Sequence, residues 1–252
     1  MRERALDRYL GALSRAIERE LQRELGYGCV TMTSRGAHDD MDFRTFLASR
    51  DAIVQAFGRA DWSAVADFDD LRRLGQEVEA AMMEGTGGIN THKGLIFLHS
   101  FLILAWVRGV TWAELASFIR DFAQPLAADY EKARFQKSAL LNREGVRDIR
   151  QIPLSGFAFI IEEMGAFRAM SDDRLTLELL SRVDDTTTIA RSSLATLRKL
   201  QKRAGEVLAM EGEAQREGAE ALSRYYVDQR ISSGGVADLF TTIRTLEALD
   251  FD

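Results

Sequence analysis

The sequence has very little cysteine and proline. Its 252 residues include one cysteine, Cys29, and two prolines, Pro125 and Pro153. A single thiol cannot form an internal disulfide, which is typical of a protein from a reducing compartment. Since no histidine is near Cys29 in the sequence, we interpret it as a small buried residue and not as a nucleophile. The scarcity of proline favours long helices without breaks.

The chain also lacks a membrane-spanning run and an excess of positive charge. The most apolar run, residues 95–107, is too short to cross a bilayer and contains His99, which we interpret as a core histidine. The first residues are charged from Arg2 onward, which is not the pattern of a signal peptide. A net charge of −6 argues against a nucleic-acid partner. We therefore expect a cytoplasmic protein with no membrane and no nucleic-acid partner.

Helix-forming residues dominate the composition. Hydrophobic residues make up 46% of the chain, which is enough for a sizeable core. Alanine, leucine, glutamate and arginine are abundant, and runs of β-branched residues are few. We expect an all-α fold with one domain over residues 1–252, arranged as a helical bundle with a polar cleft formed by interhelical loops. Residues 95–107 should be its buried central helix.

Residues 86–94, TGGINTHKG, are the most unusual stretch of the chain. Two adjacent glycines and several polar side chains lie between two apolar helical segments. Backbone N–H groups at glycines can approach an anion closely, and the next helix would begin beside it. We interpret the stretch as a phosphate-binding loop. The alternative is a helix C-cap at Gly87 or Gly88 followed by an N-cap at Thr91.

Acidic residues cluster just before the second expected helix. His38, Asp39, Asp40 and Asp42 lie within five consecutive residues. Carboxylates in this place can cap the helix that follows. Several hard oxygen ligands together also suit a Mg²⁺ ion that bridges phosphates. Both interpretations stay open, and the second predicts Asp40, Asp42 and Glu79 as metal ligands.

Three segments of the first hundred residues resemble the triphosphoribosyl-dephospho-CoA synthase family. Residues 86–97 are similar to its signature, which is close to TGGVNTHKGAIF. Residues 36–49, GAHDDMDFRTFLAS, resemble its G-x-H-x-D-M-D-x-x-x-F-x-x-S block. Glu79, Met82 and Thr86 fit its E-x-x-M-x-x-x-T block. The blocks occur in the same order as in the family.

Two later segments continue this resemblance. Residues 184–193, DDTTTIARSS, resemble the family's DTN-x-x-x-R-G-G block. Residues 231–243, ISSGGVADLFTTI, resemble its closing ISPGGSADLLA block. The matching residues that we carry forward are Asp185, Arg191, Gly234, Gly235 and Asp238.

Two segments depart from the family pattern. Where the family has Pro-Lys-Pro-Gly-Leu-Val, residues 25–30 read LGYGCV and lack the lysine. The family's arginine-rich loop reads approximately YGxxGARGEAxxGF. Here Arg150 is kept, while the Gly-Glu-Ala after it is replaced by residues 151–153, Gln-Ile-Pro. Each change removes a charged group from an expected substrate site.

The resemblance implies an all-helical transferase that moves the triphosphoribosyl group of ATP to the ribose 2′-hydroxyl of 3′-dephospho-CoA, releases adenine and uses Mg²⁺. Such glycosyl transfer needs a proton acceptor, a hydrogen-bond donor for the leaving base and a cationic cradle for the triphosphate. The implied catalytic residues are Glu79, Asp42 and His92, and the implied Mg²⁺ ligands are Asp40, Asp42 and Glu79. The implied substrate-binding residues are Gly87, Gly88, Asn90, Thr91, Lys93, Arg150, Asp185, Arg191, Gly234, Gly235 and Asp238.

Two alternatives stay open for the function. One is a divergent member of the family that acts on another nucleotide or phosphoribosyl substrate, and the other is a non-catalytic nucleotide-binding protein. A homodimer is also open. We make two structural predictions: the blocks converge on one cleft, and Lys93 contacts a phosphate instead of forming a structural salt bridge.

Overall fold

Helices are the only regular secondary structure in the residues that the computed structural model describes, 2–132 and 141–249. This confirms the all-α expectation. The elements are α1 (Arg2–Leu21), α2 (Phe43–Arg59), α3 (Phe68–Gly85), α4 (Lys93–Val107), α5 (Trp112–Ala123), the 3₁₀ helix η1 (Gln124–Glu131), α7 (Gln151–Leu154), α8 (Ala158–Arg168), α9 (Asp172–Arg182), α10 (Thr186–Arg191), α11 (Leu194–Leu208), α12 (Gly212–Asp228) and α13 (Gly234–Glu247). None of the described helices is long and apolar enough to cross a membrane.

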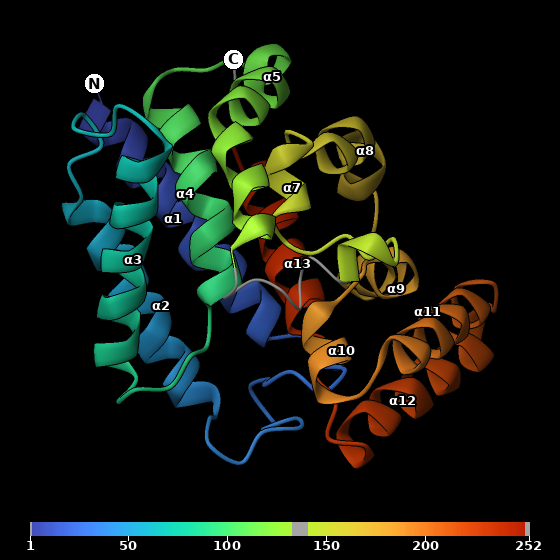
Figure 1. Ribbon diagram of the computed structural model, residues 1–252. Coiled ribbons are helices and arrows are strands. Elements are labelled where there is room, and N and C mark those ends of the chain that lie inside the picture. Colours follow the sequence, from blue (N-terminus) through green and yellow to red (C-terminus); the bar gives the residue numbers. More distant parts are fainter. Residues whose placement is uncertain (1, 133–140, 250–252) are drawn as a thin grey trace.

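Helix α4 lies at the centre of the fold, as its sequence predicts. It packs against α1, α3, α5 and α13 (Figure 1). Its residues from Leu95 to Ala105 are buried, apart from the half-buried Phe97. His99 is a core histidine with both ring nitrogens in contact: Tyr9 Oη is 2.8 Å from Nδ1 and Thr242 Oγ1 is 3.4 Å from Nε2. The apolar run therefore serves as the surface on which the other helices are assembled.

Polar side chains set where several helices begin. Asp42 caps α2 by accepting a hydrogen bond from the Thr45 N–H, and Thr45 bonds back in a capping box. A capping box between Thr111 and Glu114 opens α5. Pro125 lies in the first turn of η1, directly after α5. Its fixed φ suits the first turn of a helix, where no N–H donor is needed.

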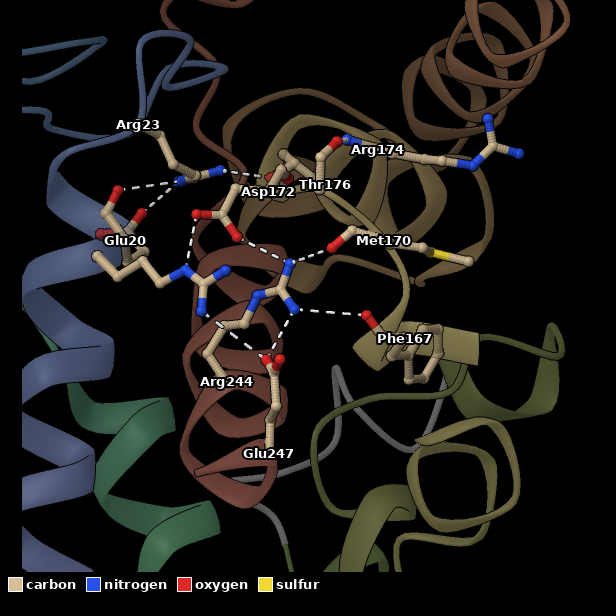
Figure 2. A network of polar contacts seen from close by, with 11 residues as sticks. Glu20, Arg23, Phe167, Met170, Asp172, Arg174, Thr176, Arg244 and Glu247 are labelled. Carbon is tan, nitrogen blue, oxygen red and sulfur yellow. Dashed lines mark hydrogen bonds and ion pairs between the residues drawn. The ribbon is translucent and has the colours of Figure 1, made fainter. Parts of the chain in front are cut away.

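A buried arginine network fastens α13 to its neighbours (Figure 2). Arg244 of α13 donates to the carbonyl oxygens of Phe167 and Met170, and its Nη2 is 2.8 Å from Asp172 Oδ1. Above it in this view, Arg23 pairs with Glu20 and donates to Thr176 Oγ1 of α9. Since a buried guanidinium left without partners would be strongly destabilising, these contacts hold α1, α9 and α13 in one arrangement. This network was not predicted from the sequence.

Candidate active site

A cavity of about 760 Å³ opens between α3, α4, α10, α13 and the loops that connect them. Residues from all five family-like segments line its wall, which confirms the prediction that these segments converge. The lining residues taken from those segments include His38, Met41, Phe46, Glu79, Asn90, Thr91, His92, Lys93, Asp184, Asp185, Arg191, Ser232, Gly234, Gly235 and Asp238. Arg147 and Arg150 of the arginine-rich loop also face it. A cleft between interhelical loops was the expected form of the site.

One part of the wall is apolar and aromatic. Phe68 of α3 stacks on Phe101 of α4 with ring centroids 6.0 Å apart, and Phe97 meets Phe101 edge to face at 5.5 Å. Ile149 and Ile152 line the same cavity from the loop before α7 and from α7 itself. Flat aromatic and aliphatic surfaces of this kind suit a heterocyclic base or another apolar part of a ligand.

Asp185 joins the N-termini of two helices. Its Oδ1 accepts hydrogen bonds from the N–H groups of Thr187 and Thr188 in α10, at 2.7 and 3.1 Å. Its Oδ2 accepts from the Val236 N–H at the start of α13, at 3.1 Å, and the Gly235 N–H also bonds this carboxylate. Burial raises the pKa of Asp185, and the four N–H donors act against that rise. This residue is therefore a structural cap that faces the cavity.

Asp238 plays a similar part at the start of α4. Its carboxylate accepts a hydrogen bond from the Leu95 N–H, and its Oδ2 occupies the space beside Gly94 where a side chain would stand. Burial, and then the nearby negative charges of Asp185 and Glu20, raise the pKa of Asp238 well above its usual value. The raised pKa favours the protonated form of this buried carboxyl group.

These two carboxylates correct an expectation from the sequence. The N-termini of α4 and α13 were expected to lie beside a bound phosphate, with Gly234 and Gly235 as substrate-binding residues in the second case. In the structure, carboxyl groups of the protein itself accept from these helix starts instead: Asp238 accepts from Leu95, and Asp185 accepts from Gly235. Gly234 and Gly235 still line the cavity, close to Thr187 and Asp185.

Gly87 and Gly88 do not belong to the cavity wall. Their N–H groups bond the carbonyl oxygens of Glu84 and Met83, at 3.2 and 2.7 Å, and so end α3. Both glycines have positive φ, of 67° and 92°, which is the conformation that terminates helices. The expectation that they bind a phosphate is therefore corrected. The alternative of a helix C-terminus describes them, but the C-cap residue itself is Thr86 and the two glycines follow it. The N-cap position of α4 is His92, not Thr91, and makes no side-chain cap bond.

His92 is buried and belongs to a chain of hydroxyl groups. Thr91 Oγ1 donates to Ser49 Oγ at 2.6 Å, which leaves the Ser49 hydroxyl proton for His92 Nδ1 at 2.7 Å. The proton of the neutral ring is then on Nε2. Phe46 packs edge to face against the imidazole at 4.9 Å. Burial lowers the pKa of His92 to about 4, so the ring is neutral at pH 7.

Lys93 and Glu79 form an ion pair at the mouth of the cavity. The Lys93 Nζ bonds Glu79 Oε1 of α3, and 61% of the lysine side chain is exposed. The prediction that Lys93 would not form a salt bridge is corrected by this contact. Because the pair is exposed, it contributes little to stability and leaves the ammonium group able to move to another anion.

The predicted metal ligands do not come together. Asp42 is the N-cap of α2 and its Oδ2 lies 3.3 Å from Arg35, while Asp40 is exposed and neither residue lines the cavity. Glu79 is in the cavity wall but is paired with Lys93. Among residues 2–132 and 141–249 no group of three or more His, Cys, Asp or Glu side chains is placed to hold a metal ion. The described residues therefore do not fit a resident Mg²⁺ site, and the capping interpretation of Asp42 is confirmed.

His38 connects two of the family-like segments. Arg191 Nη2 is 3.1 Å from His38 Nδ1, and Arg191 Nη1 donates to the Ala37 carbonyl at 3.3 Å. On the other side of the ring, Nε2 is 3.2 Å from Ser232 Oγ. Burial and then the Arg191 charge lower the pKa of His38, so a neutral ring accepts from the arginine and donates to the serine. Arg191 thus holds a loop of the cavity wall in place.

Sequence comparison agrees with the resemblance of the motifs. The model of the ATP:dephospho-CoA triphosphoribosyl transferase family matches residues 7–250. The chain belongs to this family. It is 29% identical to the 2-(5''-triphosphoribosyl)-3'-dephosphocoenzyme-A synthase of Klebsiella pneumoniae, over 95% of this chain and 90% of that protein. It is 28% identical to a probable synthase of the same name from Vibrio cholerae, over 84% of this chain and 78% of the relative. No solved structure matches the chain.

Most of the residues predicted for the site line the cavity, and their roles in substrate binding stay predictions. Asn90, Thr91, His92, Lys93, Arg150, Asp185, Arg191 and Asp238 all line the cavity, together with Glu79. Arg150 is paired with Asp148 at 3.0 Å. The residues outside the cavity wall are Asp40, Asp42, Gly87 and Gly88.

Several residues in or beside the cavity wall were not predicted as site residues from the sequence. Arg72 of α3 and Asp129 of η1 line the cavity and bond each other. Neither lies in a family-like block, and each looks like an ordinary surface residue of an amphipathic helix. Ser49 and His38 do lie in the His-x-Asp-Met-Asp block, so for these two residues the block itself was a usable signal.

Proposed function

We propose that the protein transfers the triphosphoribosyl group of ATP to the ribose 2′-hydroxyl of 3′-dephospho-CoA with release of adenine. Membership of the transferase family supports this proposal. The observation that carries it is the cavity of about 760 Å³, which combines an aromatic surface, buried carboxylates and arginines in one volume. Its size is within the usual range for small-molecule sites. The cytoplasm is the compartment proposed for this reaction.

The reaction exchanges one bond at the anomeric carbon of the ATP ribose. The bond from C1′ to the adenine nitrogen breaks and the bond from C1′ to the acceptor 2′-oxygen forms. The acceptor hydroxyl loses a proton, and the departing adenine takes one up. Positive charge develops on the sugar between these events, as in glycoside hydrolysis. The protein must therefore provide a proton acceptor and a proton donor in a site that excludes water.

We propose that Asp238 provides the proton for adenine. It lines the cavity, and burial with neighbouring negative charge raises its pKa and favours its protonated form. A carboxylic acid held neutral in this way can donate a proton to a leaving group. The neutral His92 is the second donor of the wall, because its Nδ1 is occupied by Ser49.

We propose that Mg²⁺ enters with the nucleotide, as the complex with the ATP phosphates. This agrees with the described residues, which assemble no group of three ligands. Phosphate oxygens and water can supply most of the octahedral shell that Mg²⁺ prefers. No protein residue is therefore assigned to the ion.

Adenine release tests the proposal. The purified protein is incubated with ATP, Mg²⁺ and 3′-dephospho-CoA, and the products are separated by chromatography with mass detection. We expect one adenine for each molecule of product that carries the triphosphoribosyl group. If adenine is released only with a different acceptor alcohol, that alcohol replaces dephospho-CoA in the proposal. No adenine release with any acceptor, combined with tight ATP binding, would reject transfer in favour of nucleotide binding alone.

A further inference from the structure

One buried carboxylate in the cavity wall is surrounded by three cations. Both oxygens of Asp129 accept hydrogen bonds from Arg72 Nη2, at 2.9 and 2.8 Å. Lys132 Nζ is 2.6 Å from Asp129 Oδ1, and Arg150 Nε is 4.0 Å from Asp129 Oδ2. The Asp129 side chain is only 4% exposed. One cation would neutralise it, so three cations exceed what the carboxylate requires.

The excess remains after the neighbouring groups are counted. Asp148 adds a second buried carboxylate, which bonds Arg150 at 3.0 Å and accepts a hydrogen bond from Tyr130 at 2.7 Å. Among residues 2–132 and 141–249, these three cations and two carboxylates leave one positive charge, and the exposed Arg147 of the cavity wall adds another. Although burial acts to raise it, contacts with Lys132 and Arg72 hold the pKa of Asp129 below its usual value. The wall is therefore cationic at neutral pH.

The other carboxyl groups of the cavity wall are each engaged within the protein. Asp185 accepts hydrogen bonds from four backbone N–H groups, Glu20 is paired with Arg23, and a raised pKa favours the protonated form of Asp238. Arg191 is engaged with the Ala37 carbonyl and His38. The surroundings of Asp129 are therefore the part of the site where cations gather around one carboxylate.

We propose that Arg72, Lys132 and Arg150 form the subsite for the polyphosphate end of the substrate and that Asp129 positions them. The identity of the ligand as a nucleoside triphosphate rests on the proposed function, whereas polyanion binding by the wall does not. Arg72 is held from both sides, because its guanidinium also lies 4.6 Å from the centre of the Phe68 ring. Guanidinium groups fixed in this way are suited to phosphate because little side-chain freedom is lost on binding.

Binding of inorganic tripolyphosphate to the full-length protein tests the subsite without any reaction. Calorimetry is carried out with wild type, Lys132→Gln and Arg72→Gln. We expect each substitution to weaken binding about tenfold or more, as for loss of one charge-assisted contact. Lys132 is 43% exposed, so its variant should fold normally. Lys202→Gln is the matched control, since Lys202 is 80% exposed and pairs with Glu206 on α11. Unchanged affinity in both Lys132→Gln and Arg72→Gln overturns the proposal.

The role of Asp129 is tested by whether its substitution raises or lowers the affinity for tripolyphosphate. If it only reduced the positive charge of the wall, Asp129→Asn would bind tripolyphosphate more tightly than wild type. If it positions the cations, Asp129→Asn binds more weakly and Asp129→Glu recovers part of the affinity. Tighter binding in Asp129→Asn, in protein whose circular dichroism matches wild type, overturns the positioning role.

The two proposals fail in different ways. A wild-type protein that releases no adenine but loses tripolyphosphate binding in Lys132→Gln contradicts the proposed function and supports the subsite. Normal adenine release, with tripolyphosphate binding lost in Arg191→Gln and kept in Lys132→Gln, contradicts the subsite alone.

Discussion

Gly94 of α4 lies directly against the carboxylate of Asp238 of α13. A Cβ added to Gly94 would be 2.0 Å from Asp238 Oδ2 and 2.9 Å from Ile149 Cδ1. No side chain can therefore stand at position 94 while Asp238 keeps its bond to the Leu95 N–H. The glycine of the central motif is required by a partner in the last helix, and not by a ligand.

Gly94→Ala should destabilise the protein by about 1–3 kcal/mol, the usual cost of forcing an atom into a packed site. Adenine release should fall with it, because Asp238 must move. Urea unfolding measures the first effect and chromatography the second. Gly205→Ala is the control, since nothing lies within 4 Å of that added methyl group, and it should be neutral or stabilising. If Gly94→Ala costs the same in an Asp238→Ala background, the steric explanation is wrong.

Asp238→Asn should change how stability depends on pH. The folded-state pKa of Asp238 is raised, so the folded protein binds more protons than the unfolded chain above about pH 4. Wild-type stability should then fall as the pH rises through the folded-state pKa, by at most about 1.4 kcal/mol per pH unit from this group. Asn cannot ionise, so the variant should lose that slope. Urea unfolding from pH 4.5 to 8.5 measures it, with the exposed Asp39→Asn as the control that keeps it.

Asp185→Ala should be among the most destabilising single changes in the chain. It removes a buried acceptor for N–H groups at the starts of both α10 and α13. Buried donors left without partners cost about 1–3 kcal/mol each, and partial solvation reduces the total. We expect a loss of about 2–4 kcal/mol in unfolding free energy. Asp39→Ala, which removes an exposed ion pair, should change stability by less than about 1 kcal/mol. A loss of that small size in Asp185→Ala would show that the two helix ends do not depend on it.

His92 should remain neutral down to acidic pH. Its pKa is lowered to about 4 by burial, whereas an unfolded-state imidazole titrates near pH 6.5. Stability linked to His92 is therefore present above about pH 6.5 and is lost as the pH falls toward 4. His92→Asn, which can keep an acceptor for Ser49, should reduce that acid sensitivity. NMR titration of the ring is the direct measurement, and a midpoint between pH 6 and 7 would contradict the burial argument.

Lys93→Met should separate binding from stability. The pair with Glu79 is exposed, so unfolding free energy should change by less than about 1 kcal/mol. ATP binding should weaken about tenfold or more if the ammonium group moves to a phosphate. Calorimetry with ATP and urea unfolding give the two quantities, and Lys202→Met is the control for loss of an exposed lysine. A variant that unfolds easily but binds ATP normally would place Lys93 in the scaffold.

The fold and the location of the site could be predicted from the sequence. The apolar run 95–107 had to be buried, and polar, glycine-containing breaks between apolar helices could gather at one end of a bundle. Both signals are local in the sequence, and both are confirmed.

The roles of individual residues could not be predicted in the same way. A carboxylate before a helix looks the same whether it caps that helix, as Asp42 does, or binds a metal. Arg72 and Asp129 are 57 residues apart and lie in helices without a motif, so only the fold shows that they meet. The carboxyl groups at the starts of α4 and α13 belong to Asp238 and Asp185, which come from distant segments. Because the sequence does not show these partners, the glycines at the helix starts suggested a ligand.

The position of α13 in the chain has a consequence for synthesis. One group of cavity residues comes from positions 38–94, and the last group, which includes Asp238, follows almost 150 residues later. Until α13 has left the ribosome, the start of α4 lacks Asp238, and Arg244 has not yet joined the segments around Phe167 and Asp172. Until then the nascent chain exposes the parts of α1 and α4 that α13 covers, a state prone to aggregation. Cells short of chaperones should accumulate this protein as aggregates before they accumulate inactive soluble protein.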